Sequence, residues 1–97
     1  MKVLFEPAAR IEFVEAIRWY ADKAGQHYAT EFRNEVHRAL TLLREHPTLG
    51  SPARNDTRSM VVHRYPFNII YRVQSEILHV LAVAHQRRRP GYWVGRR

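Results

Sequence analysis

Cysteine is missing from this chain of 97 residues. The sequence therefore excludes a disulfide framework and a zinc site with thiolate ligands, and it is compatible with a reducing compartment. Long hydrophobic runs are missing too, since the longest late run, Val80 to Ala84, is far shorter than the about 20 residues that span a bilayer. The segment from Met1 to Pro7 also has too few consecutive apolar residues to form the core of a signal peptide. These features predict a soluble, cytoplasmic protein that does not use a membrane.

Histidines are present but are not spaced as metal ligands. His79 and His85 are six residues apart in a segment with strand character, which separates them by about 20 Å and prevents them from sharing an ion. The other histidines, at positions 27, 37, 46 and 63, show no ligand spacing either. We therefore expect no metal and no other cofactor.

Acidic residues are scarce in the second half of the chain. Residues 1–45 hold seven Lys or Arg and seven Asp or Glu, whereas residues 46–97 hold nine arginines and only Asp56 and Glu76, so the whole net charge of +7 falls there. The length and the 45% hydrophobic content predict one globular domain over residues 1–97. Its uneven charge predicts a positive face for an anionic partner, either nucleic acid or an acidic protein surface.

The first half of the chain has the pattern of a strand and two helices. Lys2–Phe5 is a short β-rich run, and Pro7 suits the first turn of a helix. Apolar residues then recur at offsets of three and four as far as Gly25, which is placed to end this helix. A second apolar stripe runs from Tyr28 to Leu43. Because the turn between the two helices is short, they should be antiparallel neighbours.

The pattern changes to a period of two in the second half. Two prolines and a glycine predict a loop over 46–57, and strand candidates follow at 60–65, 67–73 and 77–84. Their short connections require an antiparallel meander. The last candidate is apolar on both faces and should be central, with the first strand completing the sheet. The sequence thus predicts a two-layer α+β domain in βααβββ order, with an antiparallel α-helical hairpin on one face of a mainly antiparallel four-stranded sheet.

Residues 86–97 form a basic, aromatic C-terminal tail. Arg87, Arg88 and Arg89 are followed by Pro90-Gly91, which can turn the chain back, and by Tyr92 and Trp93. Arginine forks grip carboxylates or phosphates through two contacts, so the tail is a candidate for partner binding. The alternatives are a solvated charge run for the arginines and a structural anchor on the sheet for the two aromatic residues.

Three further side chains are candidates for contact with a partner or substrate. Arg64 and Arg72 are expected on strands, on the sheet face without helices, where a partner's strand or helix could lie or where arginines simply keep the sheet hydrated. Imidazole is the side-chain group suited to acid–base work near neutral pH, so His85 is the one candidate for acid–base chemistry; the alternative is a hydrogen bond to the following turn. Trp19 and Tyr20 are interpreted as core and hairpin packing.

Five motifs carry a family resemblance. They are Pro7-Ala8-Ala9-Arg10 with Trp19-Tyr20, Phe32-x-x-Glu35-Val36, Pro47-x-x-Gly50-x-Pro52, Arg64-Tyr65-Pro66-Phe67-x-Ile69-Ile70-Tyr71-Arg72, and Val83-Ala84-His85-x-Arg87-Arg88-x-Pro90-Gly91-Tyr92-Trp93. Over about residues 3–93 the chain resembles the toxins of bacterial type II toxin–antitoxin modules in the RelE/ParE superfamily, particularly its ParE-like, plasmid stabilisation branch. The resemblance implies a growth-inhibiting toxin that a cognate antitoxin protein holds inactive, and that contacts operator DNA only indirectly, through the antitoxin.

This superfamily contains ribosome-dependent mRNA endonucleases and inhibitors of DNA gyrase, so the fold alone does not decide the activity. Cleavage by 2′-hydroxyl attack needs a base, cations for the phosphorane charge and an acid. RelE-like nucleases typically carry an arginine three residues before the middle-strand tyrosine, where this chain has Asn68 before Tyr71. Just after the last strand, where they carry a second basic residue, it has His85 and then Gln86. The resemblance therefore favours a binding inhibitor of DNA gyrase over an enzyme.

In this interpretation no residue is catalytic, and the contacts to the target or the antitoxin are Arg64, Arg72, His85, Arg87, Arg88, Arg89, Tyr92 and Trp93. Two alternatives stay open. A RelE-like endoribonuclease acting on mRNA at the ribosome would use His85, Arg72, Arg87 and Tyr92 in a rearranged site. A non-toxic family member would act only in antitoxin binding and autoregulation.

Overall fold

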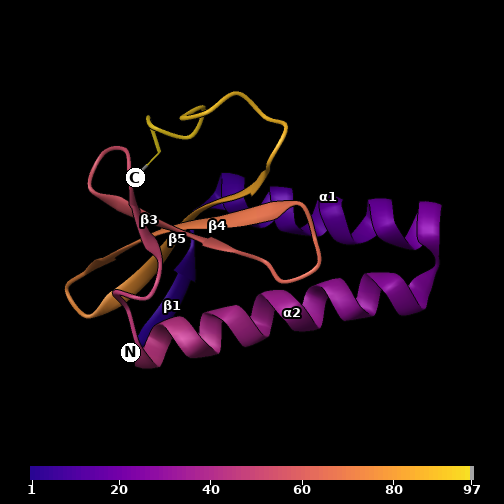
Figure 1. Ribbon diagram of the computed structural model, residues 1–97, viewed down its shortest axis with the longest axis horizontal. Coiled ribbons are helices and arrows are strands. Elements are labelled where there is room, and N and C mark those ends of the chain that lie inside the picture. The colour runs from indigo at the N-terminus through magenta and orange to yellow at the C-terminus, as the bar shows by residue number, and fades with distance from the viewer. Residues whose placement is uncertain (97) are drawn as a thin grey trace.

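Two helices cover one face of a five-stranded sheet in the computed structural model, which describes residues 1–96 (Figure 1). The elements are β1 (Lys2–Phe5), α1 (Pro7–Ala24), α2 (Gln26–Glu45), β2 (Ser51–Ala53), β3 (Thr57–Val61), β4 (Phe67–Gln74) and β5 (Ile77–His85). The strand order is β1-β5-β4-β3-β2, with β1 parallel to β5 and the other neighbours antiparallel. As predicted for a strand that is apolar on both faces, β5 has a neighbour on each side.

The predicted α+β class and the helical hairpin are confirmed, but the sheet has one strand more than the four expected. The additional strand, β2, lies inside the segment 46–57 that was predicted as a loop. It has only three residues, and Pro52 is paired with Arg58 of β3 at the edge of the sheet. A proline is tolerated on an edge strand, and three residues are too few to produce a recognisable alternation. The described helices include none that is long and apolar enough to cross a membrane.

The strand predicted over 60–65 lies earlier, at Thr57–Val61, and residues 62–66 form a turn instead. Within the turn, the amide of Val62 donates to the carbonyl of Phe67 at 2.9 Å, and Arg64 has a φ of 73°. Val62 and Tyr65 are both buried, so this apolar segment packs in the core without forming a strand. The positive φ of Arg64 leaves no mark in the sequence, because the position holds none of the residues, glycine or asparagine, that usually indicate such a conformation.

The main core lies between the helices and the sheet and is rich in aromatic rings. The ring of Phe32 lies with its centroid 5.1 Å from those of Tyr20, Tyr65 and Phe67. These contacts join α1, α2 and the start of β4. Offset and edge-on aromatic pairs add about 0.5–1.5 kcal/mol each beyond the area they bury. They therefore fix the hairpin on the sheet.

A smaller core lies on the opposite face of the sheet, under the tail. Trp93 is only 5% exposed and packs with Ile70, Leu81, Ala82 and Ala84. The pairing of β4 with β5 passes from Tyr71–Val80 to Ile70–Ala82, which makes Leu81 the extra residue of a β-bulge. A bulge turns two consecutive side chains toward one face of the sheet. Leu81 and Ala82 thus form an apolar seat for Trp93.

The hydroxyl of Tyr71 fixes the loop that precedes β2. Tyr71 is fully buried, and its hydroxyl donates to the carbonyl of Pro47 at 2.6 Å and accepts from the amide of Gly50 at 3.0 Å. A Cβ at Gly50 would lie 2.7 Å from that hydroxyl and 3.0 Å from the carbonyl oxygen of Ser59. The Pro47-x-x-Gly50 motif therefore reflects a close approach of the backbone to the Tyr71 ring.

We expect Tyr71→Phe to lower the free energy of unfolding by about 1–3 kcal/mol, because it leaves a buried amide and a carbonyl without their partner. Denaturant unfolding followed by circular dichroism measures this change. The matched variant is Tyr28→Phe, which removes a hydroxyl from a tyrosine that is 43% exposed and should cost less than about 0.5 kcal/mol. Equal losses in the two variants would contradict a special role for the Tyr71 hydroxyl.

Candidate partner-binding site

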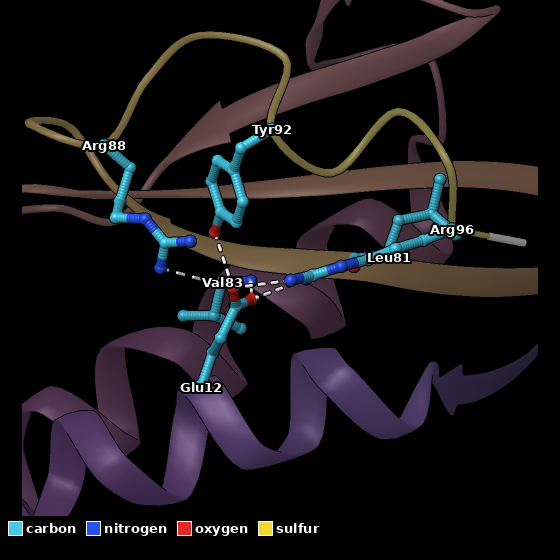
Figure 2. Close-up of polar contacts among 6 residues, drawn as sticks. All are labelled: Glu12, Leu81, Val83, Arg88, Tyr92 and Arg96. Atoms are coloured by element: carbon cyan, nitrogen blue, oxygen red, sulfur yellow. Dashed lines mark hydrogen bonds and ion pairs between the residues drawn. The ribbon is translucent and has the colours of Figure 1, made fainter.

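The tail is fixed to α1 through the carboxylate of Glu12, as Figure 2 shows. Arg96 donates to both carboxylate oxygens, from Nη1 at 2.9 Å and from Nη2 at 3.0 Å, and the hydroxyl of Tyr92 donates to Oε2 at 2.6 Å. Nη1 of Arg88 lies 4.0 Å from the same oxygen, and the guanidinium of Arg88 covers the Tyr92 ring at 3.9 Å from its centroid. One carboxylate therefore holds three side chains of the tail.

Glu12 and Arg96 also satisfy the backbone of β5 beyond the end of β1. The last backbone bond on this side joins the amide of Glu6 to the carbonyl of Val80 at 2.8 Å. Further along, the amide of Val83 donates to Oε1 of Glu12 at 3.0 Å, and Nη1 of Arg96 donates to the carbonyl of Leu81 at 3.0 Å. An unpaired strand edge exposes such groups to other chains. Here a helix side chain and a tail side chain take the place of a neighbouring strand.

The proton of Tyr92 is held firmly in this cluster. Burial is the main cause that raises the pKa of Tyr92, and the hydrogen bond to Glu12 is the second. The hydrogen bond from Arg96 to Glu12 likewise raises the pKa of Arg96. Because the folded chain favours neutral Tyr92, its contribution to stability is complete below about pH 10 and is lost as the pH rises further.

His85 makes the structural contact that was expected as the alternative to acid–base chemistry. Its Nδ1 accepts a hydrogen bond from the amide of Arg87 at 3.0 Å, and its ring lies edge-on to Phe67 with centroids 5.0 Å apart. A neutral imidazole that accepts at Nδ1 carries its proton on Nε2. His85 therefore stabilises the turn with which the tail begins.

Of the residues of the nuclease alternative, Arg87 and Tyr92 lie near His85, whereas Arg72 lies far from it. In the β4–β5 register His85 is opposite Phe67, and Arg72 lies five residues further along β4, a separation of about 16 Å. Arg72 donates to the backbone carbonyl of Asn55 at 2.8 Å and so fixes the β2–β3 turn. The hydroxyl of Tyr92 is directed at Glu12 instead.

Arg64 lies apart from the tail as well. It is in the turn before β4 and lines a small hollow of about 140 Å³ with residues of α2, among them Glu31 and Glu35. The expectation that Arg64 lies on a strand is therefore wrong, and its surroundings are partly acidic. Arg97, the last arginine of the predicted tail, lies outside the described residues.

Neutral amide side chains, joined by hydrogen bonds, stand at Asn68 and Gln86, the two positions where the resemblance to RelE-like nucleases would lead us to expect basic residues. Nε2 of Gln86 donates to Oδ1 of Asn68 at 2.9 Å, and Nδ2 of Asn68 donates to the hydroxyl of Ser59 at 2.9 Å. Neutral amides that are bonded to one another stabilise a developing phosphorane charge far less than guanidinium groups do.

Sequence reasoning missed a groove between α1 and the end of β5. The groove has a volume of about 640 Å³ and is lined by Glu12, Glu15, Ala16, Trp19, Tyr20, Pro66, Phe67, Val83, His85 and Arg88. The interpretation of Trp19 as core packing is wrong, because Trp19 is 58% exposed and only its neighbour Tyr20 is buried. The helical spacing could have indicated this, since Glu15 and Trp19 are four residues apart on one face of the helix and both are outside its buried stripe.

A helical hairpin on one face of a mixed five-stranded sheet, closed by an arginine-rich tail, defines a small α+β protein. Among solved structures, a chain of the chromosomal ParDE TA system from P. aeruginosa has the same fold, with a TM-score of 0.77 and 17% sequence identity over 88% of this chain and 95% of that one. The family model of the ParE toxin of the type II toxin–antitoxin system parDE matches residues 3–90. The chain therefore belongs to the ParE toxin family. No curated protein matches it.

We expect Glu12→Ala to release the tail from α1 while the main core stays folded. Hydrogen exchange at the Val83 amide should accelerate at least about tenfold, because hydrogen bonds to a charged group are worth about 1.5–3 kcal/mol each. The emission of Trp93, followed in a Trp19→Phe background, should shift to the red as the ring becomes hydrated.

The matched control is Glu15→Ala, which removes an exposed acid one helical turn away on α1. It should leave both signals unchanged. Equal exchange at Val83 in the two variants would show that Glu12 does not hold the tail.

Proposed function

We propose that this chain is the toxin of a type II toxin–antitoxin pair, that it acts in the cytoplasm by binding DNA gyrase without chemistry of its own, and that a cognate antitoxin neutralises it. The observation that carries the proposal is the separation of Arg72 from the other nuclease candidates. Arg72 lies five residues along β4 from Phe67, the partner of His85 on β5, the hydroxyl of Tyr92 is bound to Glu12, and Asn68 lies in a neutral hydrogen-bond chain. Family membership supports the toxin role.

The surface that would contact gyrase is the exposed start of the tail. Arg87 and Arg89 are exposed, and within residues 1–96 neither has a carboxylate within 4.0 Å. His85 fixes the backbone at Arg87, and the buried Trp93 anchors the chain beyond Gly91. The arginines thus project from a segment that is already ordered, which lowers the entropy cost of binding.

We expect the charge reversal Arg87→Glu with Arg89→Glu to raise the toxin concentration that half-inhibits DNA supercoiling at least about tenfold. Losing one partner of a desolvated charge pair at an interface typically costs about 2–5 kcal/mol or more, which is about thirtyfold or more in affinity. The measurement is a supercoiling assay with purified gyrase. Point variants are preferable to deletion of the tail, since deletion also removes Trp93 from its core.

The control variant is Arg18→Glu with Arg33→Glu, which makes the same change of net charge on the exposed faces of α1 and α2. It should inhibit gyrase within about threefold of the unchanged chain, because diffuse surface charge is screened at physiological salt. Cleavage of mRNA on translating ribosomes, with supercoiling unaffected, would contradict the proposal in favour of the RelE-like alternative. Absence of both activities would favour the non-toxic alternative.

The groove beside the tail supports the antitoxin part of the proposal. Its lining combines the exposed indole of Trp19 and other apolar surface with Arg88 at the tail. An antitoxin segment with a large apolar residue for the groove and an acidic residue for Arg88 would match this combination. Such a segment would also lie beside Arg87 and Arg89 and mask them.

We expect Trp19→Ala to weaken binding of the antitoxin encoded beside this chain at least about tenfold, since an interfacial tryptophan commonly contributes 2 kcal/mol or more. Isothermal titration calorimetry measures the affinity. Ile11→Ala is the control, because Ile11 is also 58% exposed on α1 but does not line the groove. An antitoxin that binds the Trp19 and Ile11 variants equally would exclude the groove as its site.

A further inference from the structure

A second hollow lies under the tail, on the sheet face opposite the helices. It has a volume of about 290 Å³, and its lining includes Arg54, Arg88, Arg89 and His85 but no carboxylate. We propose that this hollow binds a phosphate group with two negative charges, such as the 5′-phosphate of a nucleotide or of a nucleic-acid strand. The proposal does not depend on gyrase being the target of the toxin.

Arg54 forms the wall of the hollow that faces the tail. The hydroxyl of Thr57 donates to its carbonyl at 2.6 Å, and Nδ2 of Asn55 donates to the carbonyl of Val94 at 3.2 Å, so the β2–β3 turn and the tail are joined. Gly91 has a φ of 76°, and a Cβ there would lie 2.7 Å from Nη1 of Arg54. A glycine at this point gives both the turn and the room for the guanidinium.

The balance of charges favours a dianion. Arg88 lies 4.0 Å from Glu12, but within residues 1–96 neither Arg54 nor Arg89 has a carboxylate within 4.0 Å. Two uncompensated guanidinium groups match the two charges and three terminal oxygens of a phosphomonoester. A carboxylate has one charge and two oxygens, and a single arginine fork already satisfies it.

Neutral donors complete the site. The hydroxyl of Ser59 lines the hollow and accepts from Asn68, so its own proton is available for an anion. Because the hydrogen-bond chain from Gln86 to Ser59 fixes these groups, the donor is held in place before a ligand arrives. Pre-ordered donors of this kind reduce the entropy cost of binding a small anion.

The test is calorimetric titration of the purified chain at about 0.1 M NaCl, where the Debye length is about 10 Å and diffuse attraction is weak. The probes are inorganic phosphate, AMP, a short single-stranded oligonucleotide with a 5′-phosphate and the same oligonucleotide with a 5′-hydroxyl. We expect saturable binding of phosphate and AMP, and preference for the phosphorylated oligonucleotide over the hydroxyl form. Tighter binding of the phosphorylated oligonucleotide than of AMP would identify a nucleic-acid end as the source, and equal binding would identify a free nucleotide.

Arg54→Gln should weaken binding of AMP at least about tenfold, because one charge-assisted contact is lost. Arg33→Gln makes the same change of net charge on α2 and should have less than about a twofold effect. Thermal unfolding of both variants checks that they are folded. The absence of saturable binding, an equal loss in the two variants, or equal affinity for a glutamate-rich peptide and for phosphate would each overturn the proposal.

Discussion

The ordered state of the tail depends on one partly buried ion pair between α1 and the end of the chain. Glu12 and Arg96 are 84 residues apart in sequence, and their side chains form two hydrogen bonds of 2.9 and 3.0 Å. With Glu12 only 13% exposed, a charge left without its partner here would carry a large desolvation cost. The same two side chains satisfy the open backbone of β5, so the ion pair joins a helix, a strand edge and the tail. Tyr92 and Arg88 are then positioned by the same carboxylate.

Regular periodicity made much of the fold predictable from the sequence, whereas features that depend on long-range contacts could not be predicted. The helices follow from their apolar stripes, and the position of β5 follows from its two apolar faces. Glu12 gave no signal, because its place on the polar side of the α1 pattern is typical of solvent exposure. Only the return of the tail over α1 buries it, and no local pattern encodes that return. The bulge at Leu81 is equally invisible, since a single extra residue in an apolar strand leaves the composition unchanged.

The positive charge available to a partner is smaller and more localised than the composition suggests. Of the arginines in the second half, Arg58 and Arg72 donate to backbone carbonyls, and Arg96 is engaged with Glu12. These side chains hold parts of the structure together. What is left around the tail is the exposed Arg87 together with Arg89, which shares a hollow with Arg54. The net charge thus indicates the class of partner, whereas the hydrogen bonds show which arginines are available to contact it.

Binding in the groove would affect the tail, because the two share residues. Glu12 and Arg88 line the groove, and both also belong to the contacts that fix the tail. A ligand in the groove that supplies its own carboxylate to Arg88 would compete with Glu12 for that arginine. Because Arg88 covers the Tyr92 ring, its movement would change the surroundings of the whole turn. Coupling between an antitoxin and a target would then need no distant conformational change, only competition for one guanidinium group.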